Sequence, residues 1–184
     1  NNGYVSKENK EKIKRAIEKT GYQTNFFAKR LKSKKSYLIG VIIPRMDSYT
    51  ATKTLKGIGE RLQTLDYEMF ISITNLDLKK ELKYIRKFYL QGVDGIIVLA
   101  SEIIDEHYKL VEELPIPILF VGQEDEKLKH ISIDDIKMGQ LMGEFIKEKG
   151  HKNIVYMGVS ERDNAVGVNR KRGFMKAFEG DNYR

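Results

Sequence analysis

The chain has 184 residues, a formal net charge of +7 and no cysteine. This length suffices for one complete hydrophobic core with part of another. The lack of cysteine excludes a disulfide framework and thiolate metal sites. No apolar run approaches the roughly 20 residues of a membrane helix, and no signal peptide precedes the first helical pattern. We therefore expect a soluble, cytoplasmic protein that does not enter a membrane.

The positive charge is concentrated in the first fifth of the chain. Residues 1–36 contain 11 Lys and Arg against 3 Glu, an excess of +8, whereas the rest contains 22 basic and 23 acidic side chains, or −1. A run of like charge is usually a solvated face or a solubilising tail. Here the basic residues alternate with helix-capping and apolar residues, which favours an arm that binds a polyanion.

The first predicted helix begins after Ser6, a good N-cap, and ends at Gly21. Its apolar stripe is narrow and consists of Ile13, Ala16 and Ile17. A helix with so little apolar surface is not stable alone. We expect it to pack on helices that this chain does not contain.

A second, shorter helix is predicted in the segment that follows. Asn25 can cap it, Ala28 and Leu31 then share one face, and Lys29 and Lys32 lie elsewhere. A helix of about eight residues does not persist alone in water. It would form only on binding, and its cations favour a phosphate-bearing partner.

From Tyr37 onward, short apolar runs alternate with helical patterns. This alternation predicts an α/β domain with a doubly wound parallel sheet covered on both faces. The expected strands are Tyr37–Ile43, Met69–Thr74, Gly95–Leu99, Ile118–Val121, Ile131–Ile133 and Ile154–Met157, and the expected helices are Ala51–Leu65, Leu78–Gln91, Ile103–Leu114 and Ile136–Lys149.

Ligands of such sheets bind beyond the carboxyl ends of the strands. Polar loops follow strands in most proteins, and this explains most of the polar residues found there. Arg45 and Gln123 stand out because each directly follows an apolar strand and its Pro or Gly. The full set after the strands is Arg45, Asp47, Ser48, Tyr49, Ser101, Glu102, Gln123, Glu124, Asp125, Ser160, Arg162 and Asp163.

No catalytic constellation, cofactor motif or metal site is evident. The sequence contains no GxxxxGK[ST] phosphate-binding loop. His107, His130 and His151 are widely spaced, which favours surface or strand-edge positions over a metal site or a triad. The pair Asp134-Asp135 precedes a helix, where capping explains it. We therefore expect a binding protein and not an enzyme.

Several motifs together resemble the lactose-repressor/galactose-repressor family of bacterial transcription regulators. They are NNGYVSKENKEKIKRAIEKTGYQTNFFAKRLKSKKSYLIGVIIP, GVDGIIVLAS, PIPILFVGQ, KGHKNIVYMG and NRKRGFMKAF, in this order along nearly the whole chain. The resemblance implies a remnant of a helix-turn-helix headpiece (residues 1–24), a hinge helix and linker (25–36), an N-terminal effector subdomain (37–136) and the start of a C-terminal one (137–184).

The resemblance also implies a role in DNA binding for the hinge. Asn25 would begin the hinge helix, and Leu31 would be the wedge inserted between base pairs in the minor groove. Ala28, Lys29 and Lys32 would lie against the DNA with it. Many relatives have Arg where this chain has Lys29. Lysine keeps the positive charge but lacks the planar guanidinium group with which arginine forms two parallel hydrogen bonds.

For the effector, the arginine of the family's R-x-x-G-F motif corresponds to Arg170, and Asp163 or Asn164 would share the sugar hydroxyls. The loop PRMDSYT, which contains Arg45, Asp47, Ser48 and Tyr49, resembles repressors of disaccharide operons of the sucrose or trehalose type. In some of these an arginine placed like Arg45 binds a sugar phosphate. A local salt bridge from Arg45 to Asp47 is an equally good interpretation. Gln123 stands where many relatives have Asp, and the resemblance therefore implies that Gln123 makes a hydroxyl contact in place of that Asp.

The resemblance implies a homodimeric repressor of a carbohydrate-utilisation operon, with operator DNA and a sugar or sugar phosphate as its partners. A two-fold symmetric dimer matches a palindromic operator. The alternative is a periplasmic-type sugar-binding protein without DNA binding. That function requires an export signal and no cationic hinge. An enzyme on a doubly wound scaffold is a third possibility, but the residues for turnover are not seen.

Overall fold

The protein is described from a computed structural model, which covers residues 6–20 and 35–180. The chain forms two compact units, Asn1–Ser36 and Tyr37–Arg184. In the first unit, helix α1 (Lys7–Thr20) forms as predicted, and Ser6 caps it by accepting a hydrogen bond from the Asn9 N–H at 3.4 Å. None of the α1 residues is buried, so its apolar stripe is exposed within the described part of this unit.

The second unit contains a sheet of five parallel strands in the order β2-β1-β3-β4-β5. Continuous apolar runs form these strands because a parallel sheet is buried on both faces. The doubly wound prediction is confirmed. The strands are β1 (Leu38–Ile43), β2 (Glu68–Ile73), β3 (Gly95–Leu99), β4 (Ile118–Val121) and β5 (His130–Ile131).

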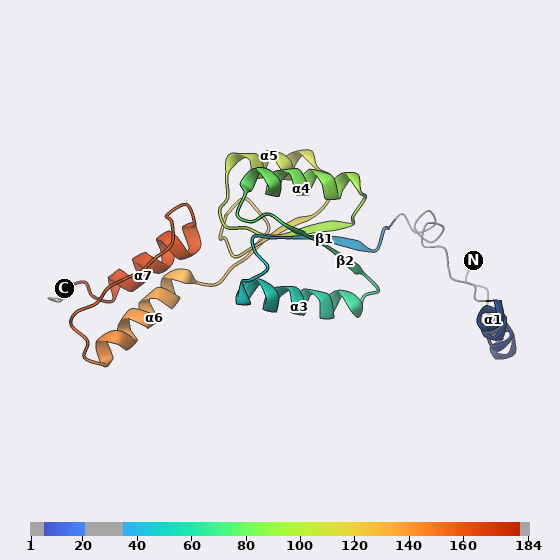
Figure 1. Ribbon diagram of the computed structural model, residues 1–184, viewed down its shortest axis with the longest axis horizontal. Coiled ribbons are helices and arrows are strands. Elements are labelled where there is room, and N and C mark those ends of the chain that lie inside the picture. Colours follow the sequence, from blue (N-terminus) through green and yellow to red (C-terminus); the bar gives the residue numbers. More distant parts are fainter. Residues whose placement is uncertain (1–5, 21–34, 181–184) are drawn as a thin grey trace. The chain divides into compact units, whose positions relative to one another are not determined.

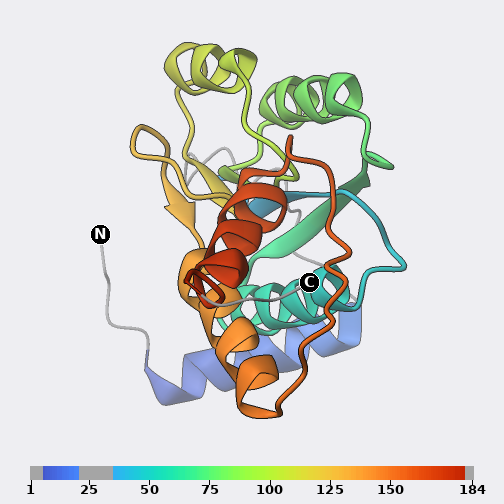
Figure 2. The ribbon, with the colours of Figure 1, turned by 90° about the vertical axis from the view of Figure 1, so that its left-hand side faces the viewer.

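Helices cover both faces of this sheet, and the views in Figures 1 and 2 agree on their placement. Helix α3 (Tyr49–Gln63) lies on one face, and α4 (Leu78–Leu90) and α5 (Asp105–Glu113) lie on the other. The N-termini of α3 and α4 are capped by side chains. The Oγ of Ser48 accepts a hydrogen bond from the Ala51 N–H at 3.3 Å, and Oδ1 of Asp77 accepts one from the Lys80 N–H at 3.2 Å.

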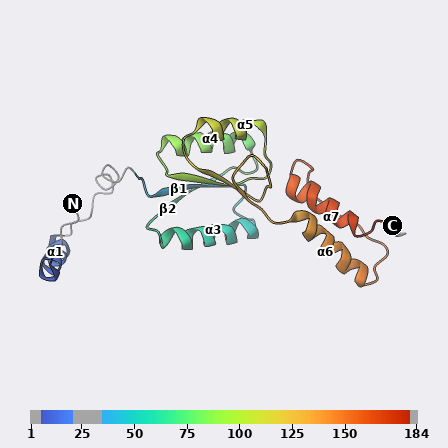
Figure 3. The same ribbon diagram turned by 180° about the vertical axis from the view of Figure 1, so that it is seen from behind.

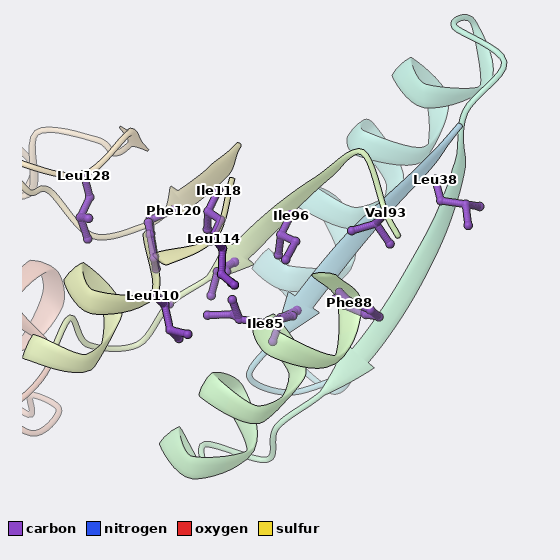
Figure 4. Close-up of a cluster of buried hydrophobic side chains, with 13 residues drawn as sticks. Leu38, Ile85, Phe88, Val93, Ile96, Leu110, Leu114, Ile118, Phe120 and Leu128 are labelled. Atoms are coloured by element: carbon purple, nitrogen blue, oxygen red, sulfur yellow. The ribbon is translucent and has the colours of Figure 1, made fainter. Parts of the chain in front are cut away.

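The core consists of one apolar cluster on each face of the sheet. The period-2 alternation of strand side chains divides β1 between them: Leu38 and Ile42 face α4 and α5, and Val41 and Ile43 face α3. Figure 4 shows the larger cluster, where Phe88 and Ile85 of α4 lie against the sheet. Gly40 makes this approach possible, because a Cβ there would collide with the Phe88 ring.

Three helices follow the sheet. They are α6 (Asp135–Glu148), the π-helix η1 (Asn164–Arg170) and α7 (Lys171–Lys176), which continues η1 directly. Helices α6 and α7 lie side by side in Figures 1 and 3. The contact is close because Gly139, Gly143 and Gly173 lie at it, and a Cβ at Gly173 would collide with the Ile136 carbonyl oxygen. We refer to residues 37–133 as the sheet lobe and to residues 134–180 as the helical lobe.

Two strand predictions differ from the structure. The predicted strand Ile154–Met157 is not formed, and the side chains of Val155 and Met157 are 91% and 92% exposed. A strand is stable only when a neighbour completes its hydrogen-bond ladder, and no described residue pairs with this segment. The predicted strand Ile131–Ile133 is reduced to β5, because its ladder with β4 contains only His130 and Ile131.

The sequence contains no apolar run of the length of a membrane helix. Within residues 6–20 and 35–180 of the structure, no helix is both long enough and apolar enough to cross a bilayer.

Candidate functional site

The carboxyl ends of the strands form the edge at which the site was predicted. Strand β1 pairs with β2 on one side and with β3 on the other. The chain therefore leaves β1 toward one side of the sheet and later returns to its other side at β3, which makes the β1/β3 boundary a topological switch point. Arg45, Ser101 and Gln123 lie just beyond the ends of β1, β3 and β4.

After β1, Arg45 and Asp47 bind each other. Arg45 Nε donates a hydrogen bond to Asp47 Oδ1 at 2.8 Å, and Nη2 pairs with Oδ2. This hydrogen bond raises the pKa of Arg45 and lowers the pKa of Asp47 from their usual values. Both side chains are exposed, so the pair contributes little to stability. The local salt bridge that the sequence suggested is present.

The other two predicted residues of this loop differ in their surroundings. The Ser48 hydroxyl oxygen is engaged in capping α3. The Tyr49 ring is exposed, and its neighbour is Lys53, whose Nζ lies 5.5 Å from the ring centroid. Tyr49 is therefore available to a ligand, whereas Ser48 has a structural partner.

After β4, Gln123 is buried, with only 3% of its surface exposed. Its Nε2 donates hydrogen bonds to the Ser101 carbonyl oxygen at 3.1 Å and to Asp163 Oδ1 at 2.9 Å. Its Oε1 accepts a hydrogen bond from the Ala165 N–H at 3.3 Å. Gln123 is thus in contact with both lobes.

Asp163 is the N-cap of η1. Its Oδ1 accepts hydrogen bonds from the Val166 N–H at 3.0 Å and from Gln123. The next residue, Asn164, is exposed. The structure therefore brings together two predicted site residues, Gln123 and Asp163, that lie 40 positions apart in the sequence.

Arg170, at the other end of η1, is held by Asp135. Its Nε and Nη2 both donate hydrogen bonds to Asp135 Oδ1, at 2.8 and 2.5 Å, and Asp135 is only 5% exposed.

The capping explanation of the Asp134-Asp135 pair holds for Asp134, whose Oδ1 accepts a hydrogen bond from the Lys137 N–H at 2.8 Å. Asp135 was missed as a site residue, because a carboxylate at a helix start has an adequate local explanation.

The predicted residues do not all converge. Among the described residues, no hydrogen bond or ion pair joins the loop of Arg45 and Asp47 to the group of Gln123, Asp163 and Arg170. The predicted DNA-binding residues cannot be placed, because they lie outside the described residues; they are Asn25, Ala28, Lys29, Leu31 and Lys32.

The expectation for His107 is wrong. This side chain is fully buried, and its two ring nitrogens contact Glu81 and the Ile104 N–H. These two partners satisfy the polar atoms of the ring and so permit its burial. His130 lies in the edge strand β5, and His151 is exposed. No group of His, Cys, Asp or Glu suited to a metal ion occurs in the part of the chain that the structure describes.

Comparison with known proteins gives a consistent result along the chain. Residues 36–181 match the family described as periplasmic binding proteins and sugar binding domain of LacI family. The chain is 36% identical over 182 residues to the sucrose operon repressor of Staphylococcus xylosus, which covers 99% of this chain and 57% of that protein. It is 28% identical over 176 residues to the HTH-type transcriptional regulator RegA of Clostridium saccharobutylicum, which covers 95% of this chain and 53% of that protein. The chain spans about half the length of these relatives.

Solved structures share the fold. One is a periplasmic binding protein/LacI transcriptional regulator from Alkaliphilus metalliredigens in complex with D-xylulofuranose. Its TM-score is 0.72 at 23% identity, and the match covers 81% of this chain and 55% of that chain. At this identity the likeness concerns the fold.

Proposed function

Since this chain belongs to the family of periplasmic binding proteins and LacI-type sugar-binding domains, we propose that it is part of a cytoplasmic transcriptional repressor of a carbohydrate-utilisation operon. The repressor is a homodimer that binds operator DNA and is controlled by a sugar or sugar phosphate. In this proposal, residues 1–24 belong to the headpiece, 25–36 form the hinge, 37–136 form one effector subdomain, and 137–184 begin the other.

One observation carries the proposal. The sucrose operon repressor aligns with 99% of this chain, so the alignment includes the cationic N-terminal segment as well as the α/β unit. A charge excess of +8 in residues 1–36 beside a nearly neutral remainder suits a protein with separate DNA-binding and effector-binding parts.

The hinge provides the proposed contact with the operator. Leu31 enters the minor groove as an apolar wedge, and Lys29 and Lys32 neutralise neighbouring phosphates. Asn25 begins the hinge helix, and Ala28 lies on the same helical face as Leu31. Because one short helix forms a weak contact, two hinges in a dimer bind a two-fold symmetric site together.

The effector site is proposed between the two lobes, beyond the carboxyl ends of β1, β3 and β4. Arg170 has a fixed orientation because Asp135 holds it from the buried side. Asp163 and Asn164 supply oxygen and nitrogen atoms at the start of η1, and Gln123 lies beside Asp163. The loop with Arg45, Asp47, Ser48 and Tyr49 completes the proposed set. A sugar presents many hydroxyl groups, which suits these mixed donors and acceptors.

The control mechanism follows from the two-part organisation. Effector binding changes how one lobe sits against the other, and this changes the distance between the paired hinge helices of the dimer. A hinge helix that loses its partner also loses its order, because it is too short to persist alone. Operator affinity then differs between the free and the sugar-bound protein.

A periplasmic sugar-binding protein is the second candidate, since the matching family includes such proteins. It would bind sugar and would have no use for DNA. The cationic segment favours the repressor, because a transport protein gains nothing from a concentrated polyanion-binding arm.

A gel-shift titration of the full-length protein against its own promoter region tests the proposal. We expect a specific shift that resists competitor DNA and changes on addition of a sugar or sugar phosphate. A scrambled promoter fragment of equal length is the control for charge-driven binding. If no specific shift occurs with or without sugars, the repressor function is excluded.

A further inference from the structure

Gln123 has an unusual environment for a polar side chain in a loop. It follows Gly122, whose φ of 97° lies in the left-handed region that favours glycine. The residues on either side, Gly122 and Glu124, are exposed, whereas Gln123 is buried. An uncharged amide is buried at low free-energy cost only when its hydrogen bonds are made.

The partners of Gln123 determine which way its amide points. Two oxygen acceptors, the Ser101 carbonyl and Asp163 Oδ1, lie on one side of it, and one donor, the Ala165 N–H, lies on the other. In the flipped orientation the amide oxygen would face two acceptors and the NH2 group would face a donor. In the orientation found, both amide hydrogens are engaged within the protein.

The same contacts join the lobes at η1. Ser101 follows β3 in the sheet lobe, whereas Asp163 and Ala165 begin η1 in the helical lobe. Asp135 holds the other end of this helix through Arg170. Both ends of the helix that carries the proposed effector contacts are therefore held by buried polar side chains.

We propose that Gln123 is a positioning residue: it latches the start of η1 to the sheet lobe, and an effector hydroxyl binds to Asp163 and not to Gln123. Asp163 Oδ1 already accepts two hydrogen bonds, whereas Oδ2 has no partner among the described residues. No buried side-chain N or O atom in the described part lacks a partner, so Oδ2 is accessible. The latch leaves this oxygen free for a ligand. The inference rests on the proposed function in assigning a sugar as that ligand.

The chemistry of the latch makes a charge test possible. Gln123→Glu preserves the shape of the side chain but places a carboxylate against the Asp163 carboxylate and the Ser101 carbonyl oxygen. Two carboxylates this close are not both ionised without strong repulsion. At acidic pH one shared proton restores a hydrogen bond between the two carboxyl groups. The contact between residue 123 and Asp163 should therefore be lost at neutral pH and form again on acidification.

The test is hydrogen–deuterium exchange of the full-length protein without any ligand, for the wild type and Gln123→Glu. At pH 7, we expect protection of residues 160–170 to fall by at least about tenfold, as for loss of a hydrogen bond to a charged group. Protection of α4 should not change. At about pH 4 the protection of residues 160–170 should return toward that of the wild type. Gln63→Glu, an equal charge change at an exposed site of α3, is the control.

Three results would overturn the latch. They are unchanged protection of residues 160–170 at pH 7, an equal loss of protection in α4 and in residues 160–170, and a loss that does not depend on pH. Titration of full-length wild type and Gln123→Glu with sucrose and with sucrose 6-phosphate tests the proposed function separately. If exchange shows the latch but neither probe binds the wild type, the latch stands and this choice of effector fails.

Discussion

Glu81 and His107 form a hydrogen-bonded pair inside the sheet lobe. Nε2 of His107 lies 2.9 Å from Oε1 of Glu81, and the side chains of His107 and Glu81 are 0% and 2% exposed. Nδ1 of His107 accepts a hydrogen bond from the Ile104 N–H at 3.1 Å, so this nitrogen carries no proton. The ring proton therefore lies on Nε2, which donates it to Glu81. The pair joins α4 to α5.

His107→Ala should destabilise the protein strongly, because it leaves the Glu81 carboxylate buried without its partner. We expect the free energy of unfolding to fall by about 3–5 kcal/mol. Glu81→Gln keeps an oxygen acceptor for Nε2 and should lower it by only about 1 kcal/mol. Urea unfolding followed by circular dichroism measures both. Equal effects of the two substitutions would contradict this account of the pair.

Gly173→Ala should separate α7 from α6, because the added Cβ would collide with the Ile136 carbonyl oxygen. Overpacking of this kind lowers the free energy of unfolding by about 1–3 kcal/mol. Gly57→Ala is the matched control, since Gly57 lies within α3 and a Cβ there meets nothing within 4 Å. It should stabilise the protein by about 0.5–1 kcal/mol, because alanine favours the helix. Thermal unfolding curves that show the same sign for both would refute the close contact.

The pKa of Tyr108 should lie well above the usual value for a tyrosine. Its hydroxyl donates a hydrogen bond of 2.5 Å to Asp125, and this bond raises the pKa of Tyr108 to about 12. Because the folded state holds the proton more tightly than the unfolded state, the stabilisation is complete below about pH 10 and is lost as the pH rises toward 12. The difference in absorbance near 295 nm between the wild type and Tyr108→Phe isolates this group. In Asp125→Asn the pKa should fall toward 10, and an unchanged value would exclude the carboxylate as the cause.

Leu31→Ala should weaken operator binding by the full-length protein by about 1–3 kcal/mol, because the proposed minor-groove wedge is lost. Sugar affinity should not change, since the proposed effector site contains no hinge residue. Leu90→Ala, at an exposed leucine at the end of α4, is the control and should change neither affinity. Gel shifts and calorimetric sugar titrations measure the two affinities. If Leu31→Ala reduces both together, the hinge assignment is wrong.

Arg45→Ala should discriminate between a phosphorylated sugar and its unphosphorylated form. If the guanidinium leaves Asp47 to bind a phosphate, the variant should lose about tenfold more affinity for the phosphorylated form. Arg86→Ala is the control, because Arg86 forms a similar exposed ion pair with Glu113 on the helices that cover the sheet. Isothermal titration of both forms provides the comparison. An equal loss of affinity for the two sugars would refute a phosphate-binding role for Arg45.

Local patterns in the sequence predicted the architecture well. The apolar runs at Leu38–Ile43 and Gly95–Leu99 became buried parallel strands, and Ser6 and Asp134 became helix caps. The same kind of pattern was wrong at Ile154–Met157, because β structure needs a pairing partner that the run itself does not specify. The π-helix η1 was not expected, because a π-helix is rare and has no distinct residue period.

By itself, the sequence determined the alternation of strands and helices, the caps and the location of the charge, because these depend on residues a few positions apart. Only the tertiary structure decided which polar groups meet. Gln123 and Asp163 are 40 positions apart, Arg170 and Asp135 are 35, and Glu81 and His107 are 26. Many carboxylates in the chain would satisfy each partner equally well by chemistry alone. The choice among them is made by the packing that brings distant segments together and buries them where an unpaired polar group would be costly.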